Sequence, residues 1–106
     1  MTELNLTEGQ CFQKEEKIYK IIEIESDLLK KINFIDIELK EHSIIQQDFI
    51  VKFGDSLPIE SNYFDQKVIK YNENKITKNI NNQEIVEEIK IQIQKYFPDL
   101  IKKRTN

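Results

Sequence analysis

The chain has 106 residues and a formal net charge of −3, and 39% of its residues are hydrophobic and spread along its length. This length suits one domain that buries roughly 60 to 70% of its unfolded surface, and the apolar content excludes wholesale disorder. One cysteine, one histidine and two glycines exclude an intramolecular disulfide, a zinc ligand set and a glycine-rich phosphate loop, so we expect neither metal nor cofactor.

Residues 1–8 are polar and are predicted to form a loose N-terminus. They lack the basic stretch and apolar run of a secretory signal, and no part of the chain approaches the roughly 18 apolar residues of a membrane span. We therefore expect a cytoplasmic protein with no membrane partner.

The next segment, residues 10–80, is predicted to be a β-rich meander. A first strand is expected at 10–12 and a turn at 14–16. Residues 17–25 read KIYKIIEIE, and this richness in β-branched isoleucine favours a strand over a helix. Simple alternation along that strand places Ile18, Ile22 and Ile24 on one face and Tyr19 and Ile21 on the other.

A second long strand is predicted within residues 28–39. Ile35, Ile37 and Leu39 alternate there with Asp36 and Glu38, a pattern typical of a half-buried strand. The polar residues 40–43 then suit a hairpin loop.

Three further features complete the predicted meander. Phe49, Val51 and Phe53 alternate with polar residues over 48–53, which indicates a strand. The loop 56–62 contains a proline and is expected to be irregular. Residues 67–71 and 75–80 are predicted to pair as a hairpin.

The C-terminal segment, residues 81–101, has the strongest helix signal. Asn81 is a candidate N-cap with Glu84 three residues later, as in a capping box. A single stripe about 120° wide holds the following apolar residues: Ile85, Val86, Ile89, Ile93, Tyr96, Phe97 and Leu100. Alternation of Ile89, Ile91 and Ile93 is a competing strand signal, and the longer stripe favours the helix. Residues 102–106 follow as a basic tail.

Together these elements predict the α+β class for a single domain spanning residues 1–106. A small antiparallel, partly curled β-sheet is packed by one C-terminal α-helix, and an SH3-like partial barrel is one form that such a sheet takes.

Few side chains offer catalytic or metal chemistry. His42 beside Glu41 suggests a general base or one metal ligand, but without partner ligands it is predicted to be a solvated loop histidine. Cys11 is predicted to be a small buried side chain and not a nucleophile. Asp36 and Glu38 are two apart on a strand and so share a side, which we interpret as the solvated face of that strand. We expect no catalytic residues and no enzyme.

Charge is distributed unevenly along the chain. Residues 1–66 carry 14 acids and 7 lysines, whereas residues 67–106 carry 5 acids and 9 bases. The acidic portion is expected to meet a basic protein partner, for instance a nucleic-acid-binding enzyme. Its candidate contacts are Glu15, Glu16, Asp36 and Glu38. In the reverse hypothesis the basic end binds nucleic acid directly, through Lys95, Lys102, Lys103 and Arg104.

Ile91 breaks the pattern of the predicted helix, because it falls on the polar face. That outer face is a second candidate protein-binding surface, formed by Glu84, Glu87, Glu88 and Ile91.

These observations predict a non-enzymatic protein-binding module. Its most concrete form is a small acidic inhibitor from a phage or another mobile element that acts on a host nucleic-acid enzyme, in the manner of anti-CRISPR proteins. The absence of alanine, the 19 isoleucines and the 15 lysines to one arginine fit an AT-rich coding sequence and contribute to this hypothesis. The alternative is a small nucleic-acid-binding barrel that uses the basic C-terminal end.

Overall fold

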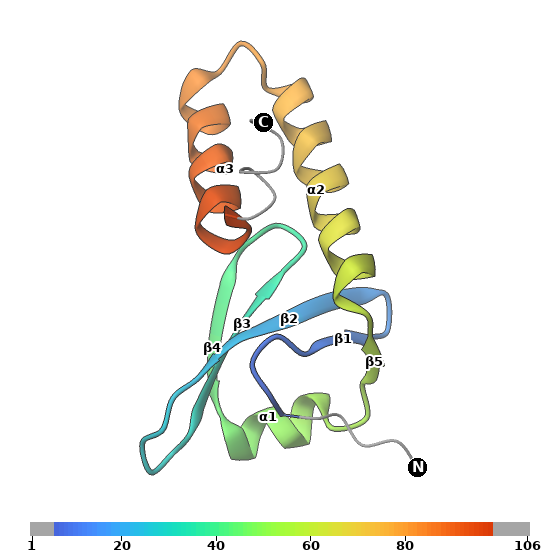
Figure 1. Ribbon diagram of the computed structural model, residues 1–106, viewed down its shortest axis with the longest axis vertical. Helices are drawn as coiled ribbons and strands as arrows, with labels where there is room; N and C mark the ends of the chain where they lie inside the picture. Colours follow the sequence, from blue (N-terminus) through green and yellow to red (C-terminus); the bar gives the residue numbers. More distant parts are fainter. Residues whose placement is uncertain (1–5, 99–106) are drawn as a thin grey trace. The chain divides into compact units, whose positions relative to one another are not determined.

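The computed structural model describes residues 6–98, which belong to two compact units, residues 1–68 and residues 69–106 (Figure 1). Each unit is described by itself below.

The first unit is built on an open five-stranded antiparallel sheet with the strand order β4-β3-β2-β1-β5. The strands are β1 (Cys11–Lys14), β2 (Lys17–Ile24), β3 (Lys31–Asp36), β4 (Glu41–Ile45) and β5 (Leu57–Ile59). The first four form the predicted meander, and β5 returns to pair with β1. The α+β class is confirmed, and the sheet does not close into a barrel because β4 and β5 remain its two edges.

The α1 helix (Gln46–Phe53) covers one face of this sheet, where a strand was predicted over 48–53. Phe49 and Phe53 are both fully or almost fully buried, and a spacing of four residues puts them on one side of a helix. The Phe49 ring meets the Phe12 ring edge-on at a centroid distance of 5.4 Å, and the Phe53 ring meets that of Phe34 at 5.3 Å. The prediction was wrong because alternation and four-residue spacing coincide in this short run, and helix packing buries both phenylalanines together.

A β-bulge corrects the predicted faces of β2. The register between β2 and β3 shifts between Ile21 and Glu23, so the simple alternation ends there. Ile24 therefore lies on the same face as Tyr19 and Ile21 and not on the opposite face with Ile18. On that face it packs against the core cluster formed by Phe12, Ile21, Ile32, Phe34, Phe49 and Phe53.

The two turns that flank β3 take residues that were predicted to be strand. Residues 28–30 lie in the β2–β3 turn and residues 37–40 in the β3–β4 turn. Leu39 lies in a turn and has a φ of +66°, but its side chain is buried. The position is therefore apolar because it faces the core and not because it belongs to a strand. His42 is consequently a residue of β4 and not of a loop.

The β5 strand occupies part of the predicted irregular loop 56–62. Pro58 lies opposite Phe12 of β1, and proline is tolerated there because an edge strand needs ladder hydrogen bonds on one side only.

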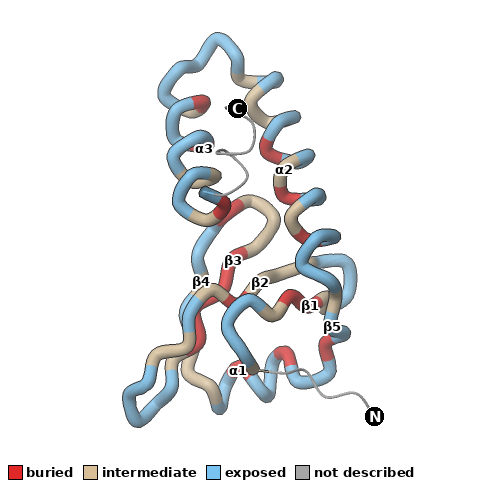
Figure 2. The backbone as a smooth tube through the Cα atoms, viewed as in Figure 1, coloured by how far each residue is buried: buried red, intermediate tan, exposed pale blue. Residues whose placement is uncertain are grey.

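The α2 helix (Ser61–Lys78) replaces the predicted hairpin over 67–80. Its first turns belong to the first unit, where Phe64 and Val68 are buried. Figure 2 shows that buried positions recur along α2. The Asp65 Oδ1 atom lies 3.7 Å from the Lys20 ammonium nitrogen of β2. Because Phe64 and Val68 are four residues apart, a helix places both on one buried face, as it does for Phe49 and Phe53 in α1.

The second unit contains the rest of α2 and the α3 helix (Gln83–Tyr96), which confirms the predicted C-terminal helix. The N-cap is Asn82 and not Asn81, because the Asn82 side chain accepts a hydrogen bond from the backbone N–H of Ile85. Val86, Ile89 and Phe97 of the predicted stripe are buried, and Ile91 is 64% exposed, which excludes the strand alternative. Leu100 and residues 102–106 lie outside the described residues.

Candidate functional site

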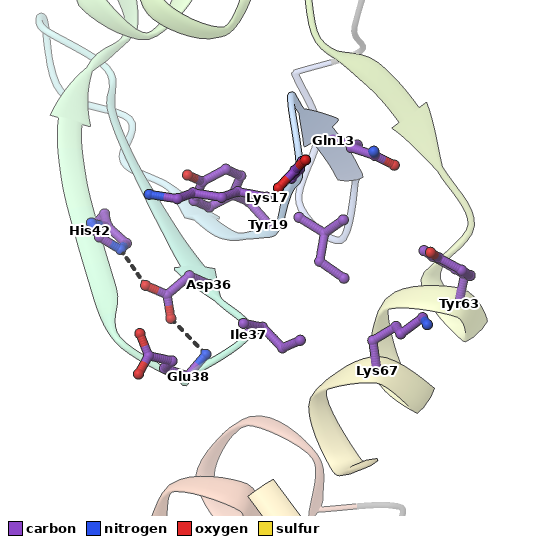
Figure 3. A pocket seen from close by; sticks show the side chains of 11 residues that line it. Gln13, Lys17, Tyr19, Asp36, Ile37, Glu38, His42, Tyr63 and Lys67 are labelled. Atoms are coloured by element: carbon purple, nitrogen blue, oxygen red, sulfur yellow. Dashed lines mark hydrogen bonds and ion pairs between the residues drawn. The ribbon is translucent and has the colours of Figure 1, made fainter. Parts of the chain in front are cut away.

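The β1–β2 and β3–β4 turns lie at the same end of the meander, and a pocket of about 380 Å³ opens there. We call it the turn-end pocket (Figure 3). Its lining residues come from the first four strands, the two turns and the start of α2: Gln13, Glu16, Lys17, Ile18, Tyr19, Asp36, Ile37, Glu38, His42, Tyr63 and Lys67. All of them belong to the first unit.

Asp36 organises the β3–β4 turn at this pocket. Its Oδ1 atom accepts hydrogen bonds from the backbone N–H groups of Glu38 at 2.9 Å and Lys40 at 3.1 Å. Its Oδ2 atom lies 2.9 Å from Nε2 of His42. Asp side chains commonly bond to the backbone two residues onward in this way, so the Asp36 carboxylate holds both the turn and the histidine.

His42 is oriented by aromatic contacts as well as by Asp36. Its ring stacks on that of Phe34 at a centroid distance of 5.1 Å and an interplanar angle of 17°, and it meets the Tyr19 ring nearly at right angles. Burial and the negative charges of Asp36 and Glu15 raise the pKa of Tyr19. The shift further favours the protonated hydroxyl, which is the ordinary form of tyrosine at neutral pH.

An aspartate that orients a histidine is one part of a nucleophilic or acid–base centre. The Ser43 hydroxyl and the Cys11 thiol are engaged elsewhere. The Ser43 hydroxyl donates to Asn33 Oδ1 at 2.6 Å. Cys11 is buried, and desolvation raises the pKa of its thiol to about 11. The Asp36 carboxylate orients the His42 ring at the pocket.

The α2 helix contributes two pocket residues that the sequence analysis did not select, Tyr63 and Lys67. Tyr63 is 47% exposed, and the Lys67 ammonium lies 5.5 Å from the centre of its ring. In Figure 3 both side chains approach from α2, across the pocket from Asp36 and His42. No sequence signal marked them, because the segment was expected to be a loop and a strand.

The four acids predicted as one protein-binding face gather at this end of the sheet. Glu16, Asp36 and Glu38 line the pocket, and Glu15 is the neighbouring turn residue, with a φ of +57°. The pairing of β2 with β3 brings them together, since Tyr19 lies opposite Asp36 in the register. Two lysines, Lys17 and Lys67, also line the pocket, so its charge is mixed.

The other predicted surfaces lie in the second unit. Glu84, Glu87, Glu88 and Ile91 are all exposed on α3. The Lys95 ammonium lies 5.1 Å from the centre of the Tyr96 ring. Lys102, Lys103 and Arg104 fall outside the described residues, so the predicted nucleic-acid contact is described only at Lys95.

Within residues 6–98, no group of three or more histidine, cysteine or acidic side chains is arranged to hold a metal ion. In the same part of the chain, none of the helices combines the length and the apolar character needed to cross a membrane. Comparison with protein-family models, with curated proteins and with solved structures finds no match.

Proposed function

We propose that the chain is a non-enzymatic protein-binding module and that the turn-end pocket contacts a basic segment of its partner. The observation that carries this proposal is the convergence of acids from two separate turns on one pocket. Like charges gathered at one place attract an oppositely charged surface and repel competitors.

Two features of the pocket support a protein as the ligand. Tyr63 offers an exposed aromatic ring, and tyrosine is enriched among residues that contribute strongly to protein interfaces. The Asp36 carboxylate is bonded to His42 and to the turn, so it fixes the shape of the surface, and Glu15 and Glu16 add negative charge beside it.

In its most specific form, the proposal is an acidic inhibitor from a phage or mobile element that occupies the basic nucleic-acid channel of a host enzyme. The support is the net charge of −7 over residues 1–66, from 14 acids and 7 lysines, which resembles that of a polyanion. The partner would then release the protein as salt rises, because exposed charge pairs are screened.

A matched pair of charge reversals tests this proposal. The double variant Glu15→Lys/Glu16→Lys changes the pocket, and Glu87→Lys/Glu88→Lys makes the same charge change on the outer face of α3. Each immobilised protein is exposed to lysate of the source cells, and bound proteins are identified by mass spectrometry at low and high salt. We expect a nucleic-acid enzyme that wild type and the α3 variant retain, that the pocket variant loses, and whose activity the wild type inhibits.

A mobility-shift assay with DNA and RNA at low salt separates this proposal from the alternative. Wild type should bind free nucleic acid poorly, because a net charge of −3 repels a polyanion. Tight binding that is lost on neutralising Lys95, Lys102, Lys103 and Arg104 would replace the proposal with direct nucleic-acid binding. If only the Glu87→Lys/Glu88→Lys variant loses the captured enzyme, the outer face of α3 and not the pocket contacts the partner.

A further inference from the structure

The β2–β3 turn, at the opposite end of the sheet from the turn-end pocket, presents two adjacent leucines to solvent. Leu28 is 102% exposed and Leu29 is 62% exposed. The centre of a turn is ordinarily filled by glycine, asparagine, aspartate, serine or proline. Leucine at both central positions fits no requirement of the turn itself.

The conformation of this turn is fixed. The Lys30 backbone N–H donates to the Asp27 carbonyl oxygen at 3.1 Å and to Asp27 Oδ1 at 2.9 Å. Lys30 adopts a φ of +49°. The backbone N–H of Gln46, the first residue of α1, donates to the Lys30 carbonyl oxygen at 3.0 Å, which ties the turn to the helix.

The leucines share a groove of about 340 Å³ with Ile45, the last residue of β4, and with Ile50 of α1, which is half exposed. Lys30, Gln46 and Gln47 complete its lining. We call the four apolar residues, Leu28, Leu29, Ile45 and Ile50, the hairpin-tip patch. In Figure 1 the β2–β3 turn and α1 lie at the same end of the sheet. Large contiguous apolar patches mark interaction sites in soluble proteins, and this groove offers an apolar contact to a partner.

The charges beside the leucines indicate which partner fits. Asp27 precedes the leucine pair and Lys30 follows it, both exposed. Asp27 Oδ2 and the Lys30 ammonium make no ion pair with any residue in the described part of the chain. A partner that carries a single sign of charge here would place a like charge against one of the two.

We propose that the hairpin-tip patch binds the same patch of a second copy of this chain, forming a two-fold symmetric dimer. A two-fold interface repeats each contact, residue i with j and j with i. The leucine pairs then pack against each other, and Asp27 of each copy faces Lys30 of the other. The dimer leaves the turn-end pocket of each copy free, because the two sites lie at opposite ends of the strands.

Sedimentation velocity over a range of concentrations measures the assembly. Wild type should form a species of twice the 12.7 kDa chain mass, and the fraction of that species should rise with concentration. The double variant Leu28→Ser/Leu29→Ser should remain monomeric. Leu57→Ser removes an equally exposed leucine from β5 and should dimerise as wild type does.

A charge-complementation experiment isolates the proposed pairing. Asp27→Lys gives a chain with two lysines beside the leucines, and Lys30→Asp gives a chain with two aspartates. Each variant alone should be monomeric at concentrations where wild type is dimeric, because like charges then face each other. An equimolar mixture should form a heterodimer, which native mass spectrometry identifies by its mass. Circular dichroism on each variant confirms that the chain is folded.

Several results would overturn the proposal. The proposal is wrong if wild type stays monomeric at every concentration. It is also wrong if the Leu28→Ser/Leu29→Ser variant still forms the dimer. A mixture of the two charge variants that remains monomeric while both are folded excludes the Asp27–Lys30 pairing. Monomeric wild type that binds anionic lipid vesicles through the leucines assigns the patch to a lipid surface instead.

Discussion

Cys11 shows how burial controls the chemistry of a single residue. The side chain is 1% exposed, its thiol contacts the Gly9 carbonyl oxygen at 3.7 Å, and desolvation raises its pKa from 9.0 to about 11. The thiolate is the nucleophilic form of cysteine. A thiol in this environment is therefore protonated at neutral pH and shielded from reagents.

We expect iodoacetamide to alkylate folded protein far more slowly than protein in concentrated urea, at the same neutral pH. Mass spectrometry of timed samples measures both rates. Equal rates would show that Cys11 is accessible in the native state.

The same raised pKa makes stability depend on pH in the alkaline range. Between pH 9 and about 11 the unfolded chain loses the thiol proton while the folded chain keeps it, so the stabilisation present below pH 9 is lost as pH rises. Urea unfolding of wild type and Cys11→Ala should show a steeper decline for wild type across this window.

At the scale of elements, those with one unambiguous pattern were predicted well. The strand predicted over residues 17–25 is confirmed as β2 because its richness in β-branched isoleucine outweighed a helix of similar spacing. The α3 helix is confirmed because its apolar stripe extends over four turns and its cap supplies a start signal. The α1 and α2 helices were missed for opposite reasons: α1 is short and reads equally as alternation, while α2 is polar and asparagine-rich.

The α3 helix provides a sharp test of element packing. Ile89 is 3% exposed, whereas Ile91, two residues away, faces solvent. Ile89→Ala should lower the free energy of unfolding by about 2 to 5 kcal/mol, and Ile91→Ala should lower it by under about 1 kcal/mol. Chemical denaturation of both variants measures the difference. Equal losses would contradict the helical assignment.

The candidate site was predictable only in part, because it depends on strand register. Glu16 and Glu38 are 22 residues apart in the sequence, and only the pairing of β2 with β3 brings their turns to one pocket. The His42–Asp36 pair was hidden for the same reason, since Glu41 is the nearer carboxylate in sequence. Tyr63 and Lys67 required knowledge of where α2 begins.

At the scale of the whole molecule, the candidate binding surfaces of the described chain are formed by different elements. The first unit carries the turn-end pocket at one end of its strands and the hairpin-tip patch at the other, and the second unit carries the exposed acids of α3. A dimer through the patch would present two pockets per assembly. Such bivalency strengthens binding to a partner that offers two sites, without any new contact.

Every turn of the four-stranded meander contains a non-glycine residue in the left-handed region: Glu15, Lys30 and Leu39. This conformation costs an L-residue roughly 1 to 2 kcal/mol, and glycine adopts it freely. None of the three side chains is dispensable in our account. Glu15 belongs to the proposed partner surface, Lys30 to the proposed dimer, and Leu39 is buried in the core.

If the two proposals hold, stability and binding are opposed at the turns that contain Glu15 and Lys30. Lys30→Gly should relieve the backbone strain and raise the free energy of unfolding by up to about 1 kcal/mol after the added flexibility of the unfolded chain is counted, while it removes the Lys30 charge and weakens the dimer. Thermal melting of the variant at a concentration where wild type is monomeric measures the first effect, and sedimentation measures the second. A chain selected for stability alone would place glycine at Glu15 and Lys30, and the two proposals account for its absence, because each gives the side chain a contact that glycine would not supply.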